Sequence, residues 1–394
     1  MPGTTDEAET KSIPSEGNSM SIATSADARP CYFPAEWYTS KEIFEQEQHA
    51  IFGATWVAVA PSGALPTSGS FRAITVADEP VVLVRGDDGQ VRAFSNVCRH
   101  RGSLLCQGDG NADTLRCPNH AWTYSLDGRL VRAAHLDASD FANGQGDLLP
   151  IAAGEFAGTI LVNLSEDAPP LGDSLGDIPR QLRDYGVENL TLTREATLNA
   201  ECNWKILVEN LTETYHTSAV HPGLAQAWAD EGFHVGSASA PWMRWWYEHP
   251  ATALGGAAPT LSILRGSNPR PIIPNIDDEC RRSVRFFRLF PNISYVCSPD
   301  YVVTLIILPN GPEKATLLQS FLFPFPTTPG FDASDAYDSW DSILAEDMAA
   351  ISLLQRGQHS KRFSTARMTV PYEQAVADFQ SMVRAKVDPE DQLP

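Results

Sequence analysis

Short runs in which hydrophobic and polar residues alternate fill much of the first half of the chain, a pattern that predicts β-strands. Turn-forming residues separate the runs, and the Asp127-Gly128 pair between two of them is typical of a tight hairpin. The predicted strands cover residues 73–76, 81–85, 91–94, 123–126 and 129–132, with two more between 154 and 164. We therefore expect a small all-β domain over residues 56–165.

The segment ahead of this domain has a different pattern. Residues 39–42, Thr-Ser-Lys-Glu, have the form of a capping box, and Ile43, Phe44 and Ile51 follow it. We expect a helix over residues 40–52, in a leading segment (residues 31–55) that packs on the second domain. Residues 1–30 are rich in Thr, Ser, Glu and Gly and lack an apolar stretch, which predicts a disordered tail rather than a secretory signal.

Helices and strands are mixed after the linker-like sequence Ala168-Pro169-Pro170. Strands are predicted at residues 190–198 and repeatedly between 283 and 324, where turns at residues 299–300 and 309–311 favour antiparallel pairing. Helices are predicted over residues 178–185, 204–217, 334–357 and 372–386. Residues 166–394 are therefore expected to form a second domain of the α+β class.

Composition argues against several classes of partner. The chain has 394 residues and a formal net charge of −20, with no basic run that could neutralise phosphates, so we expect no nucleic-acid partner. The longest apolar stretch, residues 302–308, is too short to cross a membrane. Seven cysteines, an odd number, fit metal ligation in a reducing cytoplasm better than a disulfide framework.

Cys98, His100, Cys117 and His120 form the first group of candidate metal ligands. Their pattern is C-x-H, sixteen intervening residues, then C-x2-H. Two thiolates and two imidazoles can hold a zinc ion, or a [2Fe–2S] cluster in which sulfur binds one iron and nitrogen the other. A single residue between Cys and His differs from the common zinc spacings, which favours the cluster and leaves a structural zinc site as the alternative.

His216 and His221 form the second group. They are five residues apart, about 140° around a regular helix, so both can face one ion only if the helix breaks; Pro222 agrees with a break there. Glu213, three residues before His216, would share its helical face. Two histidines and a carboxylate on one face of Fe(II) leave positions open for oxygen and substrate. Taken alone, two histidines at this spacing more often have surface or core roles.

Together these residues resemble the alpha subunits of Rieske non-heme iron oxygenases, the ring-hydroxylating family. The family's motif C-x-H-R-G, then C-x2-H-x-W-x-Y-x3-G, is matched between Cys98 and Gly128, with Asn119 and Ala121 where many members have Tyr and Gly. Its catalytic motif is matched by N-W-K at 203–205 and by E-N-x2-E-x-Y-H-x4-H-P over 209–222. The resemblance covers residues 38–386. It implies an all-β Rieske domain and an α+β catalytic domain whose helices cover an antiparallel sheet.

The resemblance also implies roles for individual residues. The [2Fe–2S] cluster would be held by Cys98, His100, Cys117 and His120, and the mononuclear Fe(2+) by His216, His221 and Asp347. The third iron ligand comes from the Glu346-Asp347 pair, with Gln355 eight residues after Asp347, and Glu346 is expected to be an ordinary solvated acid. Asn210 and Glu213 are assigned as catalytic residues. Glu213 is expected to link His216 to His120 of a neighbouring chain in a homotrimer.

The implied activity is oxidation of a small-molecule substrate by O2. Electrons would come from NAD(P)H through a separate flavin or iron–sulfur reductase, with or without a ferredoxin, because the chain has no dinucleotide-binding fingerprint. Glu213 stands where aromatic dioxygenases have Asp. In this respect the motif resembles that of the members acting on quaternary ammonium compounds such as choline, betaine and carnitine. Trp242, Trp245 and Trp246 are candidate contacts for such a cation, although a strand packed in the core explains this aromatic cluster better. The alternatives are an aromatic-ring oxygenase and a Rieske electron carrier without oxygenase activity.

Overall fold

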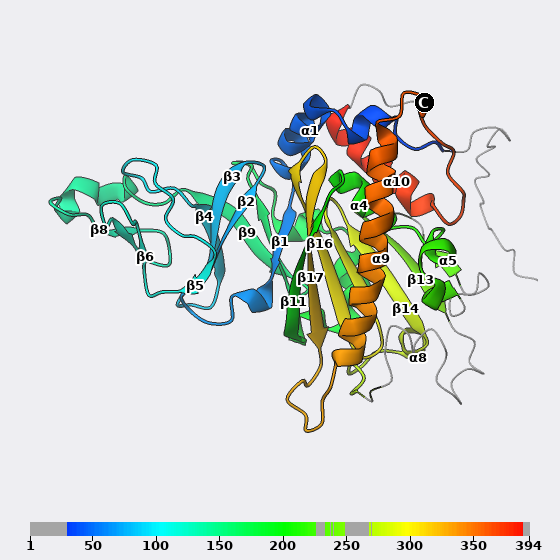
Figure 1. The fold of residues 1–394 in the computed structure, drawn as a ribbon. Coiled ribbons are helices and arrows are strands. Elements are labelled where there is room, and N and C mark those ends of the chain that lie inside the picture. Colours follow the sequence, from blue (N-terminus) through cyan, green and yellow to red (C-terminus); the bar gives the residue numbers. More distant parts are fainter. Residues whose placement is uncertain are drawn as a thin grey trace, which may run out of the picture.

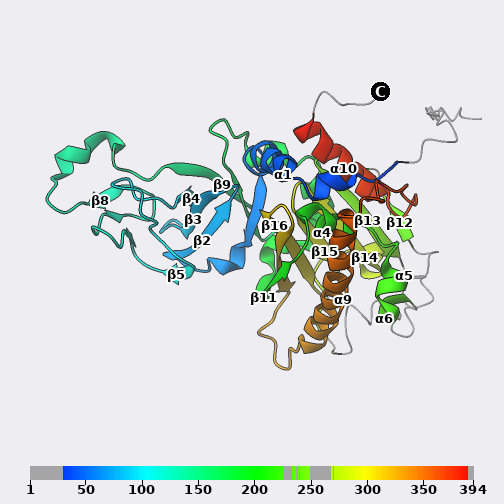
Figure 2. The same cartoon turned by 45° about the horizontal axis from the view of Figure 1, so that its top comes forward.

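Two domains lie side by side in the computed structural model, which describes residues 30–225, 233–236, 238, 240–248, 268 and 270–388 (Figures 1 and 2). The predicted disordered tail falls outside the described residues except for Pro30. Within the described part of the chain, no helix combines the length and the apolar character needed to cross a membrane.

The N-terminal domain is all-β, as the alternating pattern predicts. One antiparallel sheet has the strand order β1-β10-β9-β4-β3-β2-β5, and a small second sheet has the order β6-β7-β8. The strands are β1 (Val57–Pro61), β2 (Ser70–Val76), β3 (Glu79–Arg85), β4 (Val91–Ser95), β5 (Asp109–Asn111), β6 (Leu115–Arg116), β7 (Thr123–Tyr124), β8 (Leu130–Arg132), β9 (Pro150–Phe156) and β10 (Thr159–Asn163). Figure 1 places β6 and β8 at the end of this domain that is far from the second domain.

The second domain is built on one antiparallel sheet with the strand order β11-β17-β16-β15-β14-β13-β12. Its strands are β11 (Thr191–Ala200), β12 (Phe233–Val235), β13 (Trp242–Glu248), β14 (Ser283–Leu289), β15 (Ile293–Cys297), β16 (Val302–Gly311) and β17 (Lys314–Phe323). Its helices are α2 (Leu171–Ser174), α3 (Ile178–Leu182), α4 (Trp204–Asn210), α5 (Thr217–Val220), α6 (Pro222–Ala225), α8 (Asp278–Arg281), α9 (Ser334–Gln358) and α10 (Gln374–Val387). The α+β prediction is therefore confirmed, and α4, α9 and α10 cover one face of the sheet (Figures 1 and 2).

Both faces of this sheet are buried, which explains the continuous apolar run in β16. The helix-covered face carries Phe286, Val303 and Leu305 in the larger core. The opposite face packs Phe287 and Ile306 against residues of the N-terminal domain and of α3. At this junction the Asn292 amide donates to the Ala58 carbonyl at 2.8 Å and accepts from the Ala58 N–H at 3.0 Å. The N-terminal domain thus forms part of the support for the sheet.

The leading segment packs on the second domain. Helix α1 (Lys41–Glu47) begins after Ser40, whose hydroxyl accepts from the Ile43 N–H, and continues as a π-helical turn over Gln48–Phe52. At the end of α1 the buried Glu47 carboxylate accepts hydrogen bonds from Lys205 Nζ at 2.5 Å and from Trp204 Nε1 at 2.8 Å. Both partners begin α4, so this ion pair fixes the helix that leads into the second candidate site.

The predicted helix over residues 204–217 is wrong in its second half. Helix α4 ends at Asn210, and turns connect it to α5. Side chains bond to the backbone in this stretch: the Thr212 hydroxyl donates to the Val208 carbonyl at 2.5 Å, and the Glu213 carboxylate accepts from the His216 N–H at 3.0 Å. Such local side-chain bonds compete with a continuing helix. Glu213 therefore reaches His216 across a turn, not along a helical face.

Candidate metal centres

Two similar turns hold the first group of candidate ligands. In one, the Gly102 N–H donates to the Cys98 carbonyl at 3.0 Å, and in the other the Ala121 N–H donates to the Cys117 carbonyl at 3.1 Å. The residue that closes each turn has a left-handed backbone, with φ of 74° at Gly102 and 58° at Ala121. The turns bring the two thiols together in the interior, whereas His100 and His120 are exposed with ring centroids 4.7 Å apart.

The donor set fits a two-iron cluster better than one zinc ion. Four donors on one tetrahedral zinc lie about 3.4–3.8 Å apart, from bonds of about 2.0–2.3 Å. Among the described residues, the one group of three or more donor atoms that all lie within 4.8 Å is His216, His221 and Asp347, so the Cys and His pairs of the first site stand apart from each other. Burial raises the pKa of the Cys117 thiol, but hydrogen bonds from the Asn119 and His120 N–H groups outweigh it and lower that pKa, which favours a thiolate ligand.

The left-handed conformation of Ala121 predicts a stabilising substitution. Ala121→Gly should increase the free energy of unfolding by about 0.5–1 kcal/mol, because Gly removes a strain of about 1–2 kcal/mol and loses about 0.5–1 kcal/mol in entropy. Thermal denaturation measures the change. The control is Ala73→Gly in strand β2, where no positive φ is relieved and stability should fall through the entropic cost and the lost packing of the Ala73 methyl group. An Ala121→Gly protein that melts below wild type would contradict the prediction.

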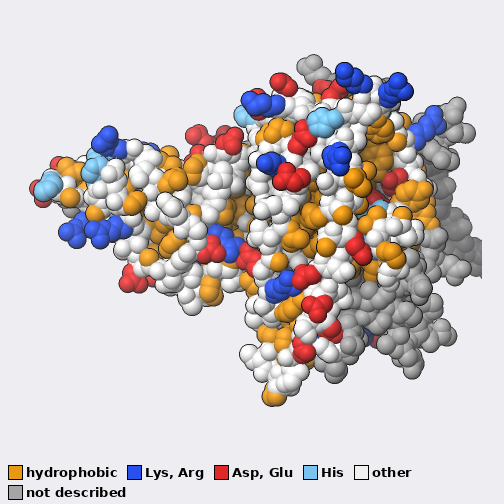
Figure 3. Space-filling view, viewed as in Figure 1, with side chains coloured by type: hydrophobic (Ala, Val, Ile, Leu, Met, Phe, Trp, Pro, Cys, Tyr) orange, Lys and Arg blue, Asp and Glu red, His pale blue; other side chains and the backbone are white. Residues whose placement is uncertain are grey.

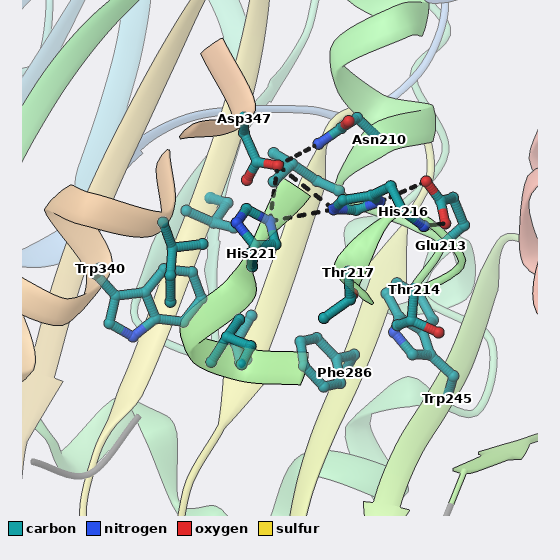
Figure 4. A pocket seen from close by; sticks show the side chains of 15 residues that line it. Asn210, Glu213, Thr214, His216, Thr217, His221, Trp245, Phe286, Trp340 and Asp347 are labelled. Carbon is teal, nitrogen blue, oxygen red and sulfur yellow. Dashed lines mark hydrogen bonds and ion pairs between the residues drawn. The ribbon is translucent and has the colours of Figure 1, made fainter. Parts of the chain in front are cut away.

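The second group converges on a single point in the catalytic domain (Figure 4). His216 and His221 flank the short helix α5, and Asp347 lies on α9. The two Nε2 atoms are 3.3 Å apart. Asp347 Oδ1 lies 3.4 Å from the Nε2 of His216 and 3.1 Å from the Nε2 of His221. Three ligands on one face of an octahedral ion lie about 3.0 Å apart, from bonds of about 2.1 Å. The geometry therefore fits a 2-His-1-carboxylate iron site.

Each of the three donors is held by a second side chain. Glu213 Oε1 lies 2.5 Å from His216 Nδ1, Glu346 Oε2 lies 2.7 Å from His221 Nδ1, and Asn210 Nδ2 donates to Asp347 Oδ1 at 2.8 Å. A carboxylate at Nδ1 keeps the proton there and turns the Nε2 lone pair toward the metal. The expectation that Glu346 is merely solvated is therefore wrong: its place beside Asp347 on α9 lets it reach His221.

The electrostatics of this site favour a cation. Burial alone would lower the pKa of His216, but the hydrogen bonds and charges of Asp347 and Glu213 raise it to about 10. Burial would raise the pKa of Asp347, yet His216 and His221 lower it. Two acids thus surround each imidazole with negative charge in a largely buried location, which is a strong attraction for Fe(2+).

The cavity beside the triad has aromatic walls. Trp245 and Phe286 stack with ring centroids 5.4 Å apart and planes 9° from parallel, and Trp340 lies across from them (Figure 4). The remaining lining residues include Leu211, Thr214, Thr217, Leu224, Val296, Leu305 and Ile343. Phe286 and Trp340 were missed at the sequence level because single aromatic residues in a strand and a helix give no signal of their own.

Of the three candidate substrate tryptophans, the structure brings Trp245 to this cavity. Alternation along β13 turns Trp242 and Trp246 to the opposite face from Trp245. Trp242 packs in the core on the side of the N-terminal domain, and Trp246 stacks on His234 with its centroid 5.1 Å away. The assignment of Trp242 and Trp246 as substrate contacts is therefore corrected.

Comparison with known proteins agrees with this geometry. Residues 55–143 match the model of the Rieske [2Fe-2S] domain, and residues 187–389 match that of the ring hydroxylating alpha subunit, catalytic domain. The chain therefore belongs to the alpha subunits of Rieske non-heme iron oxygenases, enzymes that carry a [2Fe–2S] cluster and a mononuclear iron and take electrons from a reductase.

Several relatives can be named. The carnitine monooxygenase oxygenase subunit of Escherichia coli K12 is 34% identical, covering 84% of this chain and 85% of its own. The glycine betaine monooxygenase oxygenase subunit of Chromohalobacter salexigens is 28% identical, with 88% and 83% covered. The solved structure of the quaternary ammonium Rieske monooxygenase CntA with L-carnitine matches with a TM-score of 0.75 and 26% identity, over 90% of this chain and 95% of that one.

Proposed function

We propose that this chain is the oxygenase component that hydroxylates or N-demethylates a small quaternary ammonium compound. The observation that carries the proposal is the stacked Trp245–Phe286 pair beside the triad. Aromatic faces attract quaternary ammonium groups, which cannot donate hydrogen bonds. The names of the relatives, glycine betaine monooxygenase and carnitine monooxygenase, support the same substrate class.

We assign the metal ligands within this proposal. Cys98, Cys117, His100 and His120 would hold the [2Fe–2S] cluster, which would supply the electrons. His216, His221 and Asp347 would hold the mononuclear iron, which would supply the site for O2 chemistry. Glu213 and Glu346 hold the two imidazoles, and Asn210 orients the carboxylate of Asp347.

We further propose a homotrimer in which the cluster of one chain serves the iron of the next. Within a single chain β6, which leads into the second cluster loop, lies at the far end of the N-terminal domain, whereas α5 and α9, which carry or flank the iron ligands, lie in the other domain (Figures 1 and 2). A head-to-tail ring of chains would bring them together. The study of the CntA structure describes inter-subunit electron transfer in that protein.

The surface near the cluster suggests the nature of the electron donor. Arg side chains (blue in Figure 3) gather near the far end of the N-terminal domain, where Arg99, Arg101, Arg116 and Arg132 are exposed, although the chain as a whole has a net charge of −20. Such a patch attracts an acidic partner. We propose an acidic iron–sulfur module, in a cytoplasmic reductase or a ferredoxin, as the direct donor.

Oxygen uptake with a generic reductase tests the substrate class. We expect consumption with quaternary ammonium compounds and little with neutral aromatics. Trp245→Leu should raise the Michaelis constant for the cation about 5- to 30-fold through lost cation–π attraction of about 1–2 kcal/mol. Trp246→Leu, on the opposite face of the strand, is the control. Oxidation of neutral aromatic compounds alone would favour an aromatic-ring oxygenase, for which the same stacked rings could form a pocket. The complete triad argues against a simple electron carrier.

A further inference from the structure

Arg288 on strand β14 is fully buried and its charge is unbalanced. None of its guanidinium nitrogens has a hydrogen-bond partner, and no carboxylate pairs with it among the residues that the structure describes. Burial lowers its pKa to about 9, so the group still carries a positive charge at neutral pH. An unpaired charge in a protein interior costs several kcal/mol, which a bound anion would offset.

Arg288 lies on the face of the sheet that forms the floor of the iron cavity. It is two residues from Phe286 on a regularly paired strand, so both side chains point to the same side, about 7 Å apart along the strand. Across the sheet its partner is Ser294, and the partner of Ser294 is Leu305. Phe286 and Leu305 both line the cavity. Within the sheet Arg288 is therefore next to the lining residue Phe286 along its strand, and two strands away from the lining residue Leu305.

Two further side chains of the same row are buried with unmet hydrogen-bonding groups. Ser294 and Gln319 are 1% and 0% exposed, and within the described part of the chain the Ser294 hydroxyl and both polar atoms of the Gln319 amide have no hydrogen-bond partner. Gln319 pairs with Leu305, which places it on the same face. A native interior rarely leaves so many polar groups unsatisfied together. The Ser294 hydroxyl and the Gln319 Nε2 are donors, and a carboxylate could accept hydrogen bonds from both.

We propose that Arg288, with Ser294 and Gln319, binds the carboxylate of a zwitterionic substrate whose quaternary ammonium group rests on Trp245 and Phe286. This inference depends on the proposed function and narrows it. A guanidinium holds a carboxylate through two parallel hydrogen bonds, and it repels a substrate that is only cationic. The enzyme would accordingly select betaine-type substrates, which carry a carboxylate, over choline-type substrates, which carry a hydroxyl.

Steady-state kinetics of the metal-loaded oxygenase with its reductase test this selection. Glycine betaine and L-carnitine are compared with choline in wild type, Arg288→Met and Arg285→Met. The specificity ratio, carboxylate-bearing over carboxylate-free substrate, should fall about 100-fold in Arg288→Met through a higher Michaelis constant. The specificity ratio of Arg288→Lys should lie between those of wild type and Arg288→Met, because Lys keeps the charge but cannot form two parallel hydrogen bonds. Arg285 is on the same strand, faces the other side and pairs with Glu279 at 2.7 Å, so Arg285→Met should leave the ratio unchanged.

Thermal denaturation supplies a second readout that needs no turnover. Without ligand, Arg288→Met should melt at or above the wild-type temperature, because an apolar side chain of similar length replaces an unpaired charge. Glycine betaine or L-carnitine should raise the melting temperature of wild type and not of Arg288→Met.

The outcomes separate the two levels of the proposal. Preference of wild type for choline, or equal Michaelis constants for the carboxylate substrates in wild type and Arg288→Met, would overturn the role of Arg288 while the quaternary ammonium function stands. Oxidation of none of the three compounds would end the proposed function and this inference with it.

Discussion

Glu213→Gln should load both metal centres and keep a reducible cluster, yet oxidise substrate at least about 100-fold more slowly than wild type. Glu213 holds His216 through both carboxylate oxygens, one to Nδ1 and one to the backbone N–H. A carboxylate can accept from a second imidazole as well, and we propose that this is His120 of the neighbouring chain. Gln keeps the shape but replaces an acceptor oxygen by a donor, so the link between the two centres is lost.

A single-turnover experiment isolates this step. Oxygenase with a reduced cluster is mixed with substrate and O2, and cluster re-oxidation is followed by its visible absorption. We expect a cluster that stays reduced in Glu213→Gln and in Glu213→Ala. The matched control is Glu346→Gln. Like Glu213, Glu346 holds the imidazole of an iron ligand, but it does so from α9. This variant should retain iron less tightly without slowing re-oxidation in the molecules that are loaded. Rapid re-oxidation in Glu213→Ala would contradict the bridge.

The second large effect concerns the division of the metals between two sites. We expect about three irons per chain and little zinc, two irons in the cluster and one in the triad. Cys98→Ser should lose the visible absorption because a thiolate ligand is removed, and His221→Ala should keep the colour and lose turnover to background. Metal analysis together with absorption spectra measures both. A folded His221→Ala protein without colour would refute the assignment of separate sites.

Oligomers that mix two inactive variants test the proposed ring of chains. Cys98→Ser lacks the cluster and Asp347→Ala lacks an iron ligand, so neither is expected to be active alone. When the two are reassembled in one oligomer, an intact cluster lies next to an intact triad, and part of the activity should return. If verified mixed oligomers recover no activity, electrons do not pass from the cluster of one chain to the iron of the next, and the proposed ring is contradicted.

The outline of the fold could be predicted because local residue order carries it. Alternating polarity indicated the N-terminal strands, and Gly128, with φ of 88°, closes the hairpin where Asp127-Gly128 predicted a turn. The end of α4 was not predicted. Helical spacing continues past Asn210, whereas in the folded chain turns and the side-chain hydrogen bonds of Thr212 and Glu213 follow the end of the helix.

The candidate tryptophans show the limit of a pattern. Alternation along the strand already separates Trp245 from Trp242 and Trp246, but it does not say which set faces the iron. In a sheet with one face exposed to solvent, polar residues at alternate positions identify the outer face of each strand, and the apolar residues between them identify the inner face. Here the sheet is buried on both faces, by helices on one side and by the N-terminal domain on the other, so the sequence carries no such mark.

The sequence by itself determined the metal chemistry, because two thiols and two imidazoles at those spacings, and a histidine pair within the longer motif, are closely tied to particular metals. Tertiary structure alone decided what surrounds them. Glu346 reaches His221 from a helix 125 positions away, and Arg288 lies on the same face of the sheet as the lining residue Phe286 because of how β14 pairs with its neighbours. Contacts between distant segments depend on packing and strand register, which no local pattern in the chain encodes.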